Sequence, residues 1–436
     1  MRHSNASMAI PQSRRPLILL VAGQVFSKLA VALYLLSMTL YIRGLDGSAG
    51  LLGLLQFLSL APIVVLSPIA ASLADMRGRK AILLVSDAGR GVVLLALALV
   101  LSLTASTAPL LGISAVLLTA LLVGIGQATF QPAADAFLPD LVRPSALGAA
   151  VAIRGACVQT ANLAGNAVGG LVFLALGAAS STGLTAALFL VSAAWETLLP
   201  EAAVAVNTPF NTRSKVPRIR QLFRRLIIQT HIGMRFARRT RGLAALLIMN
   251  LCFHASFPVL LIALPFFIEY QLGLGPHYLG YSFAALLAGG ILGYILLAVI
   301  RPKLDHRLLS VLVALSAPAL WMIASTAYIV PRQSAVPLYF IALLLAGVAA
   351  AGIHLIVHTA IGLSVRRSFR ARIFGLLEAS TGAASALGFL FGGPVLDLLM
   401  QSLPAVLLTL GVFGLLLSVV PFQNRGIRDF LLLGRV

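Results

Sequence analysis

The sequence predicts an all-α integral membrane protein with twelve transmembrane helices in two six-helix bundles and both termini in the cytoplasm. Three observations support this fold class: the composition, the recurrence of long apolar runs, and the distribution of basic residues. Hydrophobic residues make up 60% of the 436 residues and charged residues 10%, whereas a soluble domain carries roughly 25% charged residues. With a mean hydropathy of +1.01, most of the surface must face lipid rather than water.

Apolar runs that can cross a bilayer recur along the whole chain, since a transmembrane helix needs about 20 mainly apolar residues. The first run is longer than the hydrophobic region of a secretory signal peptide, and no A-x-A-like cleavage site follows it, so we expect a retained first span. The predicted spans are residues 16–42, 49–73, 80–104, 109–137, 146–173, 182–206, 243–270, 278–300, 307–330, 336–364, 372–397 and 402–421.

The basic residues set the predicted orientation. Of the 32 Lys and Arg, only Arg43 and Arg332 fall in predicted outer loops, and Lys28, Arg90 and Arg154 fall within spans. All the others lie in segments that are cytoplasmic if the N-terminus is inside, as the positive-inside rule requires. The net charge of +20 is then explained by anchoring beside anionic lipid headgroups, and we expect no nucleic-acid partner.

The longest polar segment, residues 207–242, divides the spans into six and six. It is rich in Arg, and a stretch around Ile219–Phe236 could form an amphipathic helix on the membrane surface. The predicted organisation is therefore an N-terminal six-helix bundle (1–206), a basic cytoplasmic linker (207–242), a C-terminal six-helix bundle (243–421) and a cytoplasmic tail (422–436). Transporters built from structural repeats have this arrangement.

Glycines recur at corresponding places in the two predicted bundles. They are Gly165, Gly169 and Gly170, with Asn166 between them, in the fifth span and Gly388, Gly392 and Gly393 in the eleventh. Small residues at four-residue spacing let helix backbones approach closely. Such glycines occur in many membrane bundles, but their recurrence in the fifth helix of each half favours an internal repeat.

A short loop between the second and third spans carries a distinctive pattern. Within Ala71–Leu83 it holds Asp75, Gly78, Arg79 and Lys80. Asp75 ends the second span and can accept charge-assisted hydrogen bonds from the N-terminus of a facing helix. Gly78 permits a tight turn, and we expect Arg79 and Lys80 to anchor the loop at the membrane face.

This loop resembles the signature loop of the major facilitator superfamily, G-x-L-a-D-r-x-G-r-k-x-x-l. Ala71 replaces the first Gly, and Met76 replaces the Arg after the Asp. The resemblance implies the twelve-helix fold of that family and transport by alternating access. It also implies that Asp75 contacts the eleventh span and latches the cytoplasmic side when the transporter is open outward.

Two further patterns resemble parts of this family. Residues Gly165–Gly170 are similar to its antiporter motif, G-P-x-x-G-G, with Asn166 in place of the Pro. Asp87 and Arg90 lie three residues apart on one face of the third span, and Asp135 ends the fourth span on the same side. This arrangement resembles the branch that contains enterobactin and macrolide exporters. Because embedded charges are costly unless paired, we expect Asp87, Arg90 and Asp135 to form one gate network with the loop.

Lys28 is a candidate for binding substrate. It lies about 18 Å into the first span at 1.5 Å per residue, which is too deep to reach the interface easily. By resemblance, the first, fourth, seventh and tenth spans line the central cavity. Lys28 could attract an anionic group of a substrate, respond to a protonation change, or pair structurally with a carboxylate. It lies where related exporters tend to carry an Asp after a Ser.

Further candidates for substrate binding or coupling are embedded in other spans. His354 and His358 share a face of the tenth span, a spacing that suits a proton relay or a metal. No third ligand is evident, so we expect no metal. His254 in the seventh span is a similar case. Glu196 in the sixth span and Glu378 in the eleventh are carboxylates embedded in the membrane-spanning part, and either could carry a proton.

The leading hypothesis is a secondary transporter of the inner membrane that couples protons to the export of a small amphiphilic or anionic compound, such as a drug, siderophore or metabolite. A lysophospholipid flippase and a solute importer on the same fold are the alternatives. An enzyme is not expected, because no cluster of catalytic groups at one depth is visible. No phosphate-cradling loop for ATP is apparent in the sequence, which argues against an ATP-driven pump. We expect no cofactor, and a monomer whose partners are substrate, protons and membrane lipid.

Overall fold

The computed structural model describes residues 15–77, 79–104, 108–142, 147–200, 231–300, 305–329, 332–365 and 367–433. Throughout these ranges the regular structure is helical, without a strand. The long helices are α1 (Arg15–Gly44), α2 (Ala49–Arg77), α3 (Arg79–Thr104), α4 (Pro109–Leu141), α5 (Leu147–Glu196), α7 (Leu243–Phe266), α8 (His277–Ile300), α9 (His306–Thr326), α10 (Val336–Ser364), α11 (Arg367–Leu398) and α12 (Leu403–Gln423).

The helix α5 is two antiparallel spans joined at Gly177. This glycine has a φ of 74°, a backbone conformation that residues with a Cβ rarely adopt. Arg154 and Ser192, on opposite sides of Gly177, hydrogen-bond neighbouring residues of α1, Gln24 and Gly23. The chain therefore folds back on itself. In the described residues, 11 helices are long and apolar enough to cross a membrane, and counting both legs of α5 confirms the predicted twelve spans.

Short elements complete the fold. A π-helical turn η2 (Phe267–Leu272) extends α7, and 3-10 turns η3 (Arg332–Ala335) and η4 (Met400–Ser402) precede α10 and α12. In the linker, residues 231–239 are helical, while the rest of the predicted amphipathic stretch lies outside the described residues. The tail forms α13 (Arg425–Leu433), and both elements contribute to one buried cluster beneath α7 and α10.

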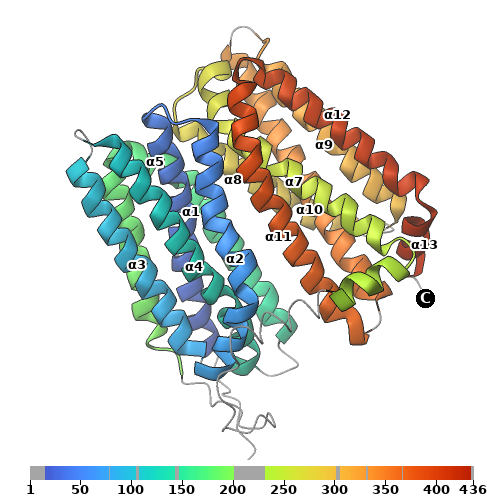
Figure 1. Cartoon of the computed structure of the whole chain (residues 1–436), viewed down its shortest axis with the longest axis horizontal. Coiled ribbons are helices and arrows are strands. Elements are labelled where there is room, and N and C mark those ends of the chain that lie inside the picture. Colours follow the sequence, from blue (N-terminus) through green and yellow to red (C-terminus); the bar gives the residue numbers. More distant parts are fainter. Residues whose placement is uncertain are drawn as a thin grey trace, which may run out of the picture.

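The helices form two halves, which are termed the N-half (α1–α5) and the C-half (α7–α13). In Figure 1 they meet at the top of the view and spread apart towards the bottom. The end where α1 begins is termed the inner end, and the end with the α1–α2 and α7–α8 turns is termed the outer end. If the termini are cytoplasmic, as the basic residues predict, the inner end faces the cytoplasm.

The hydrophobic cores follow this shape. One buried cluster at the outer end draws residues from both halves, among them Leu40 of α1, Leu52 of α2 and Phe267 of η2. At the inner end the N-half and the C-half have separate clusters, around Phe137 and Ile356 respectively. Apolar packing thus joins the halves at the outer end, while each half closes its own core at the inner end.

Candidate functional site

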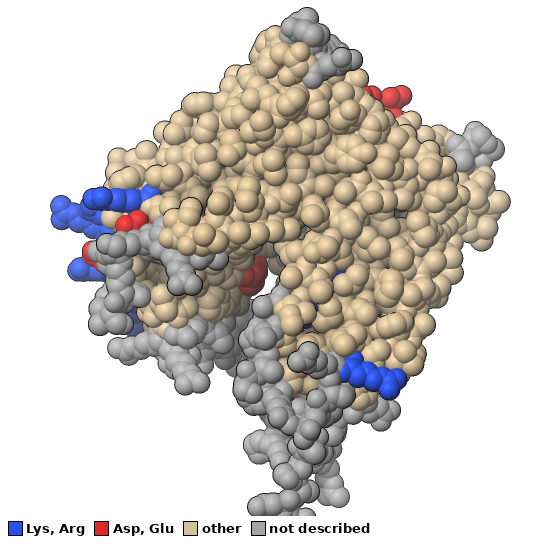
Figure 2. Space-filling view, turned by 180° about the vertical axis from the view of Figure 1, so that it is seen from behind, with Lys and Arg blue, Asp and Glu red and all other residues tan. Residues whose placement is uncertain are grey.

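A hollow separates the two halves at the inner end. Figure 2, seen from behind, shows it in the lower part of the molecule, with acidic side chains on one wall and basic side chains on the other. Charged side chains inside a membrane protein face a water-filled cavity or one another, because lipid solvates them poorly. The hollow is therefore the candidate path of a substrate.

Asp87 and Arg90 of α3 form a buried ion pair in the N-half core, with side chains 0% and 1% exposed. Arg90 also donates to Gln127 Oε1 of α4 at 2.7 Å and to Ser27 Oγ of α1 at 3.2 Å. Its guanidinium packs on the ring of Phe189, with Cζ 4.5 Å from the centroid. Arg90 thus contacts three helices besides its own: α1 and α4 through hydrogen bonds, and α5 through Phe189.

Glu196, at the end of the second leg of α5, lies beside this pair. It is 1% exposed, and neither of its carboxyl oxygens has a hydrogen-bond partner among the described residues. It packs against Gly23 of α1, where a Cβ would lie 3.4 Å from its Cγ. Asp87 and Arg90 are close enough to act on it electrostatically. Glu196 is therefore an unpartnered carboxyl group in a charged, buried cluster.

Asp135 forms a separate ion pair with Arg154 of α5, with Oδ1 2.6 Å from Nη2. Its side chain is 53% exposed and also accepts from Gln131 Nε2 at 3.1 Å. Arg154 in turn donates to Gln24 Oε1 of α1 at 2.5 Å. The groups expected in one network with the loop thus fall into two ion pairs, one buried in the core and one partly exposed.

Lys28 is half-buried on α1. No carboxylate of the described residues lies within ion-pair distance of its ammonium, although Asp135 and Asp87 act on it from farther away. It thus has the exposure and the charge to meet a ligand.

The signature loop is described in part. Gly78 and the side chain of Asp75 lie outside the described residues, and Arg79 begins α3. Lys80 Nζ donates to the carbonyl oxygens of Thr197 and Leu199 at 2.7 and 2.6 Å. The lysine therefore neutralises the C-terminal end of α5, where a cation is favoured, and fixes the start of α3 to the end of the sixth span.

The candidate residues of the C-half come together from three helices. His358 Nε2 of α10 lies 3.4 Å from Glu378 Oε1 of α11, and the ring centroids of His354 and His358 are 3.9 Å apart. His254 of α7 is within electrostatic range of His358. Among the residues that the structure describes, no group of three or more His, Cys, Asp or Glu side chains could hold a metal ion. This histidine cluster can bind or transfer protons and accept or donate hydrogen bonds.

Contacts between the halves at the outer end were not among the sequence expectations. Asp397, at the end of α11, accepts hydrogen bonds from the backbone N–H groups of Ala49 and Gly50 at 2.7 and 2.8 Å. It thereby caps the N-terminus of α2 from the opposite half, where a negative charge is favoured. Two signals could have pointed to such a contact: an acid at the end of the eleventh span and the serine–alanine–glycine start of the second.

A second polar contact joins the halves at the same end. Arg43 of α1 forms an ion pair with Glu269 of η2, donates to Tyr270 Oη at 3.2 Å and packs over the ring of Phe266, with Cζ 4.4 Å from the centroid. Arg43 was visible in the sequence as one of the two basic residues in predicted outer loops, but its partner was not.

The repeated glycines lie at helix crossings. In the N-half, a Cβ at Gly165 would be 2.7 Å from Ala32 Cβ of α1, and one at Gly170 would be 2.8 Å from His277 Cα of α8. In the C-half, Gly392 approaches Val259 of α7, and Gly393 approaches Gly50 of α2. The fifth helix of each half thus packs on the first helix of its own half and on the second helix of the other.

Gly388 and Asn166, the other two residues of these motifs, also lie at helix crossings. Gly388 lies against Ala255 and Pro258 of α7. Asn166, which stands where the resembling motif has Pro, donates its side-chain amide to Asn162 O at 2.8 Å and presents its backbone carbonyl to Gly280 of α8.

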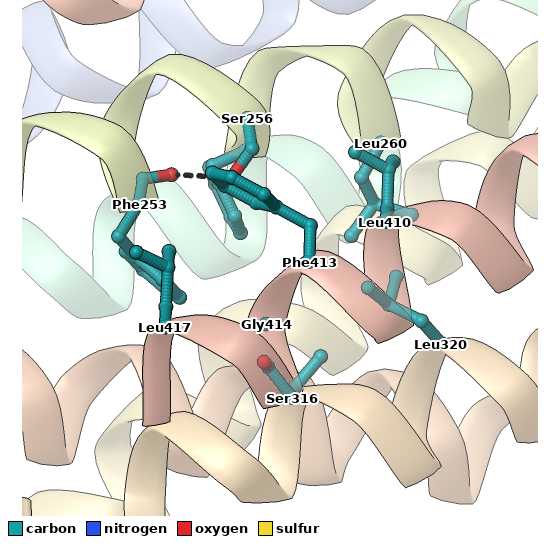
Figure 3. Close-up of a pocket in the computed structure, with 11 residues that line it drawn as sticks. Phe253, Ser256, Leu260, Ser316, Leu320, Leu410, Phe413, Gly414 and Leu417 are labelled. Carbon is teal, nitrogen blue, oxygen red and sulfur yellow. Dashed lines mark hydrogen bonds between the residues drawn. The ribbon is translucent and has the colours of Figure 1, made fainter. Parts of the chain in front are cut away.

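An apolar pocket of about 500 Å³, including space open to its surroundings, lies within the C-half. Figure 3 shows side chains of α7 facing Phe413 and Leu417 of α12 across it. Its hydroxyl groups bond within their own helices, since Ser256 donates to Phe253 O and Ser316 to Val313 O. The pocket therefore offers an apolar surface without a free polar anchor.

Comparison with known proteins agrees with this architecture. The sequence pattern of the Major Facilitator Superfamily matches residues 20–331. The multidrug efflux pump Tap of Mycobacterium tuberculosis is 25% identical over 360 residues, which cover 81% of this chain and 80% of Tap. YfiS of Bacillus subtilis, an uncharacterized transporter of the same superfamily, is 24% identical over 431 residues, or 96% of this chain and 95% of its own.

Solved structures show the same fold at lower identity. The nucleoside transporter NupG superposes with a TM-score of 0.72 at 13% identity, over 94% of this chain and 98% of its own. A bacterial homologue of the iron transporter ferroportin in an inward-facing state has a TM-score of 0.70 at 14% identity, over 94% and 99%. From the match of its sequence over most of its length and from its twelve-span, two-half fold, the chain belongs to the Major Facilitator Superfamily and is a membrane transporter rather than an enzyme.

Proposed function

We propose that this protein is a proton-coupled exporter of small amphiphilic or anionic compounds in the bacterial inner membrane. The observation that carries the proposal is the hollow at the inner end, closed at the outer end by contacts between the halves (Figure 2). Together with a cytoplasmic inner end, this is the state in which an exporter collects its substrate. Export is also supported by the similarity to Tap, which is named a multidrug efflux pump.

The substrate site would lie between the two charged walls. Lys28 on the N-half side offers a cation without a close carboxylate, and His354 on the C-half side is an exposed group on a spanning helix. A small molecule with an anionic group and an apolar body would satisfy both the lysine and the surrounding apolar helices. His254, His358 and Glu378 would complete the C-half side.

The gates would alternate between the two ends. At the outer end, Asp397 and Arg43 hold the halves together in this state. At the inner end, the loop that contains Asp75 would make the equivalent contact with α11 when the protein opens outward. The Asp75→Asn variant should then lose transport while its level in the membrane persists.

The domain limits and partners follow from the same proposal. Residues 1–206 and 243–421 would move as two bodies, linked by 207–242 and followed by the tail 422–436. Exposed arginines gather near the end of the C-half, on the left in Figure 2; they would hold this end against anionic lipid headgroups. They are Arg235, Arg238, Arg239, Arg241 and Arg425. We expect the protein to work as a monomer.

The test is uptake into inverted membrane vesicles across a panel of labelled drugs, siderophores and lysolipids, with and without an imposed pH gradient. Vesicles from cells without the protein are the control. Accumulation of a small solute that depends on the gradient supports a proton-coupled exporter. Accumulation of the same solute without regard to the gradient rejects the coupling, and accumulation of no solute rejects the exporter.

Lipid transport is a second candidate, because the pocket between α7 and α12 is lined almost wholly by apolar side chains, which suit an acyl chain. Movement of lysolipids without movement of any drug or siderophore in the same vesicles would favour this function.

A further inference from the structure

The structure assigns the proton-binding site to Glu196, in the core of the N-half and apart from the histidine cluster. This inference rests on the proposed proton coupling and names the group that performs it. Glu196 differs from the other candidate carboxylate, Glu378, which is 63% exposed beside His358. A carboxyl group that must hold a proton at one stage and release it at another is better isolated from bulk water, because burial opposes its charge.

The charges of the buried cluster require one bound proton. Asp87, Arg90 and Glu196 are each no more than 1% exposed, so the cluster contains two carboxyl groups and one guanidinium. Arg90 is ion-paired with Asp87, and this pair is neutral. A charged Glu196 would leave an uncompensated negative charge inside the membrane, which is strongly unfavourable unless the group takes up a proton.

Among the described residues, no cation besides Arg90 is placed to compensate Glu196. Lys28 lies five residues after Gly23, the α1 residue that touches Glu196, and so points about 140° away around the helix. Arg154 is paired with Asp135, and Lys80 is held by the carbonyl groups of Thr197 and Leu199. Arg90 is the described cation that acts on Glu196, and Asp87 already holds it, so Glu196 is protonated in this state.

A path leads from the hollow to this carboxyl group. Gln24 follows Gly23 on α1, and its Oε1 accepts from Arg154 while its buried Nε2 has no partner among the described residues. Arg154 pairs with Asp135, whose exposed carboxylate is open to water. Asp135, Arg154 and Gln24 thus form a chain of polar contacts that ends beside Gly23, the α1 residue that touches Glu196. Hydronium gives a proton to a Glu196 carboxylate oxygen, and water and a neutral carboxyl group result.

Release of this proton would change the hydrogen bonds between Arg90 and the helices α1 and α4. A charged Glu196 competes with Asp87 for Arg90, which also holds Ser27 of α1 and Gln127 of α4. Lys28 follows Ser27 directly. A change in the bonds of Arg90 is thus transmitted to the part of α1 that carries the proposed substrate-binding lysine.

The experiment is infrared difference spectroscopy of the purified full-length protein in lipid, recorded between acidic and alkaline pH. The C=O stretch of a protonated, buried carboxyl group lies apart from the bands of exposed acids. We expect this band in the wild type, its loss in Glu196→Gln and its retention in Glu378→Gln. Asp87→Asn should also lose the band, because Arg90 is then free to pair with a charged Glu196. Persistence in Glu196→Gln, or loss in Glu378→Gln, would assign the proton elsewhere and overturn the inference.

Isotope labelling keeps the test valid if a variant does not fold. Wild-type protein with ¹³C-labelled glutamate should show the band shifted, whereas ¹³C-labelled aspartate should leave it in place, and the reverse result contradicts the assignment. The spectra need no substrate. A failed vesicle assay with an assigned band therefore rejects transport but not the proton site, and gradient-driven uptake with an unaffected band rejects only the site.

Discussion

Among single residues, Arg90 has the largest structural role that the contacts reveal. It is fully buried, pairs with Asp87, donates to two other helices and lies between two aromatic rings, those of Phe130 and Phe189. A buried arginine is costly by itself, but removing it leaves its partner buried and charged, which costs more. Arg154, by contrast, pairs with a carboxylate that is half-exposed.

Arg90→Ala should therefore destabilise the protein by about 3–5 kcal/mol, whereas Arg154→Ala should cost about 0–1 kcal/mol. The measurement is thermal unfolding of both variants in the same detergent. The double variant Arg90→Ala with Asp87→Ala should recover part of the loss, since no charge is left unpaired. Equal effects of the two single variants would show that burial of the Asp87–Arg90 pair does not matter.

Single glycines give a second test at this scale. Alanine at Gly165 would place its Cβ 2.7 Å from Ala32 Cβ. At Gly155, in the same leg of α5, no atom lies within 4 Å of a new Cβ. Overpacking costs about 1–3 kcal/mol, and alanine in an open helical position gains roughly 0.5–1 kcal/mol over glycine. Gly165→Ala should lower the melting temperature and Gly155→Ala should not. The same change for both would show that α1 and α5 adjust freely.

At the scale of helices, the outer end shows a cap that connects the halves. Asp397 binds the first N–H groups of α2 across the interface. The corresponding contact at the inner end, implied for Asp75 and α11, would also join the second helix of one half to the fifth of the other. The two ends would thus use the same chemistry, an acid at one helix end meeting the N-terminus of another, with the halves exchanged.

Asp397→Asn should weaken the outer contact and raise the fraction of molecules with a separated outer end. Asp305→Asn is the matched control, because Asp305 caps the N-terminus of α9 within its own half, accepting from Arg307 N and Leu308 N. Distances between spin labels at Gly44 and Gln401 report the separation. The prediction is contradicted if both variants, or neither, populate the longer distance.

The sequence predicted the helices better than their contacts. Long apolar runs and the positions of Lys and Arg were enough for twelve spans, and even the division of α5 was expected from the interval between the fifth and sixth runs. The burial of Glu196 beside Asp87 and Arg90, and the partners of Arg43 and Asp397, could not be predicted. Each depends on which face of one helix meets another, and apolar spans give little periodic signal for that choice.

At the scale of the whole molecule, two halves share a core at the outer end and have separate cores at the inner end. The repeated glycines place the fifth helix of each half against the second helix of the other, so that the interface has approximate two-fold symmetry. An interface of this kind can close at either end by a rocking motion, which is the basis of alternating access.

The most direct test of this account measures both ends in the same protein. Spin labels at Gly44 and Gln401 report the outer end, and labels at Leu198 and Arg239, both exposed, report the inner end, after Cys157 and Cys252 are replaced by Ser. The distances are recorded in lipid over a range of pH. Alternating access predicts that the outer distance lengthens as the inner distance shortens; distances that stay fixed, or that lengthen together, would contradict it.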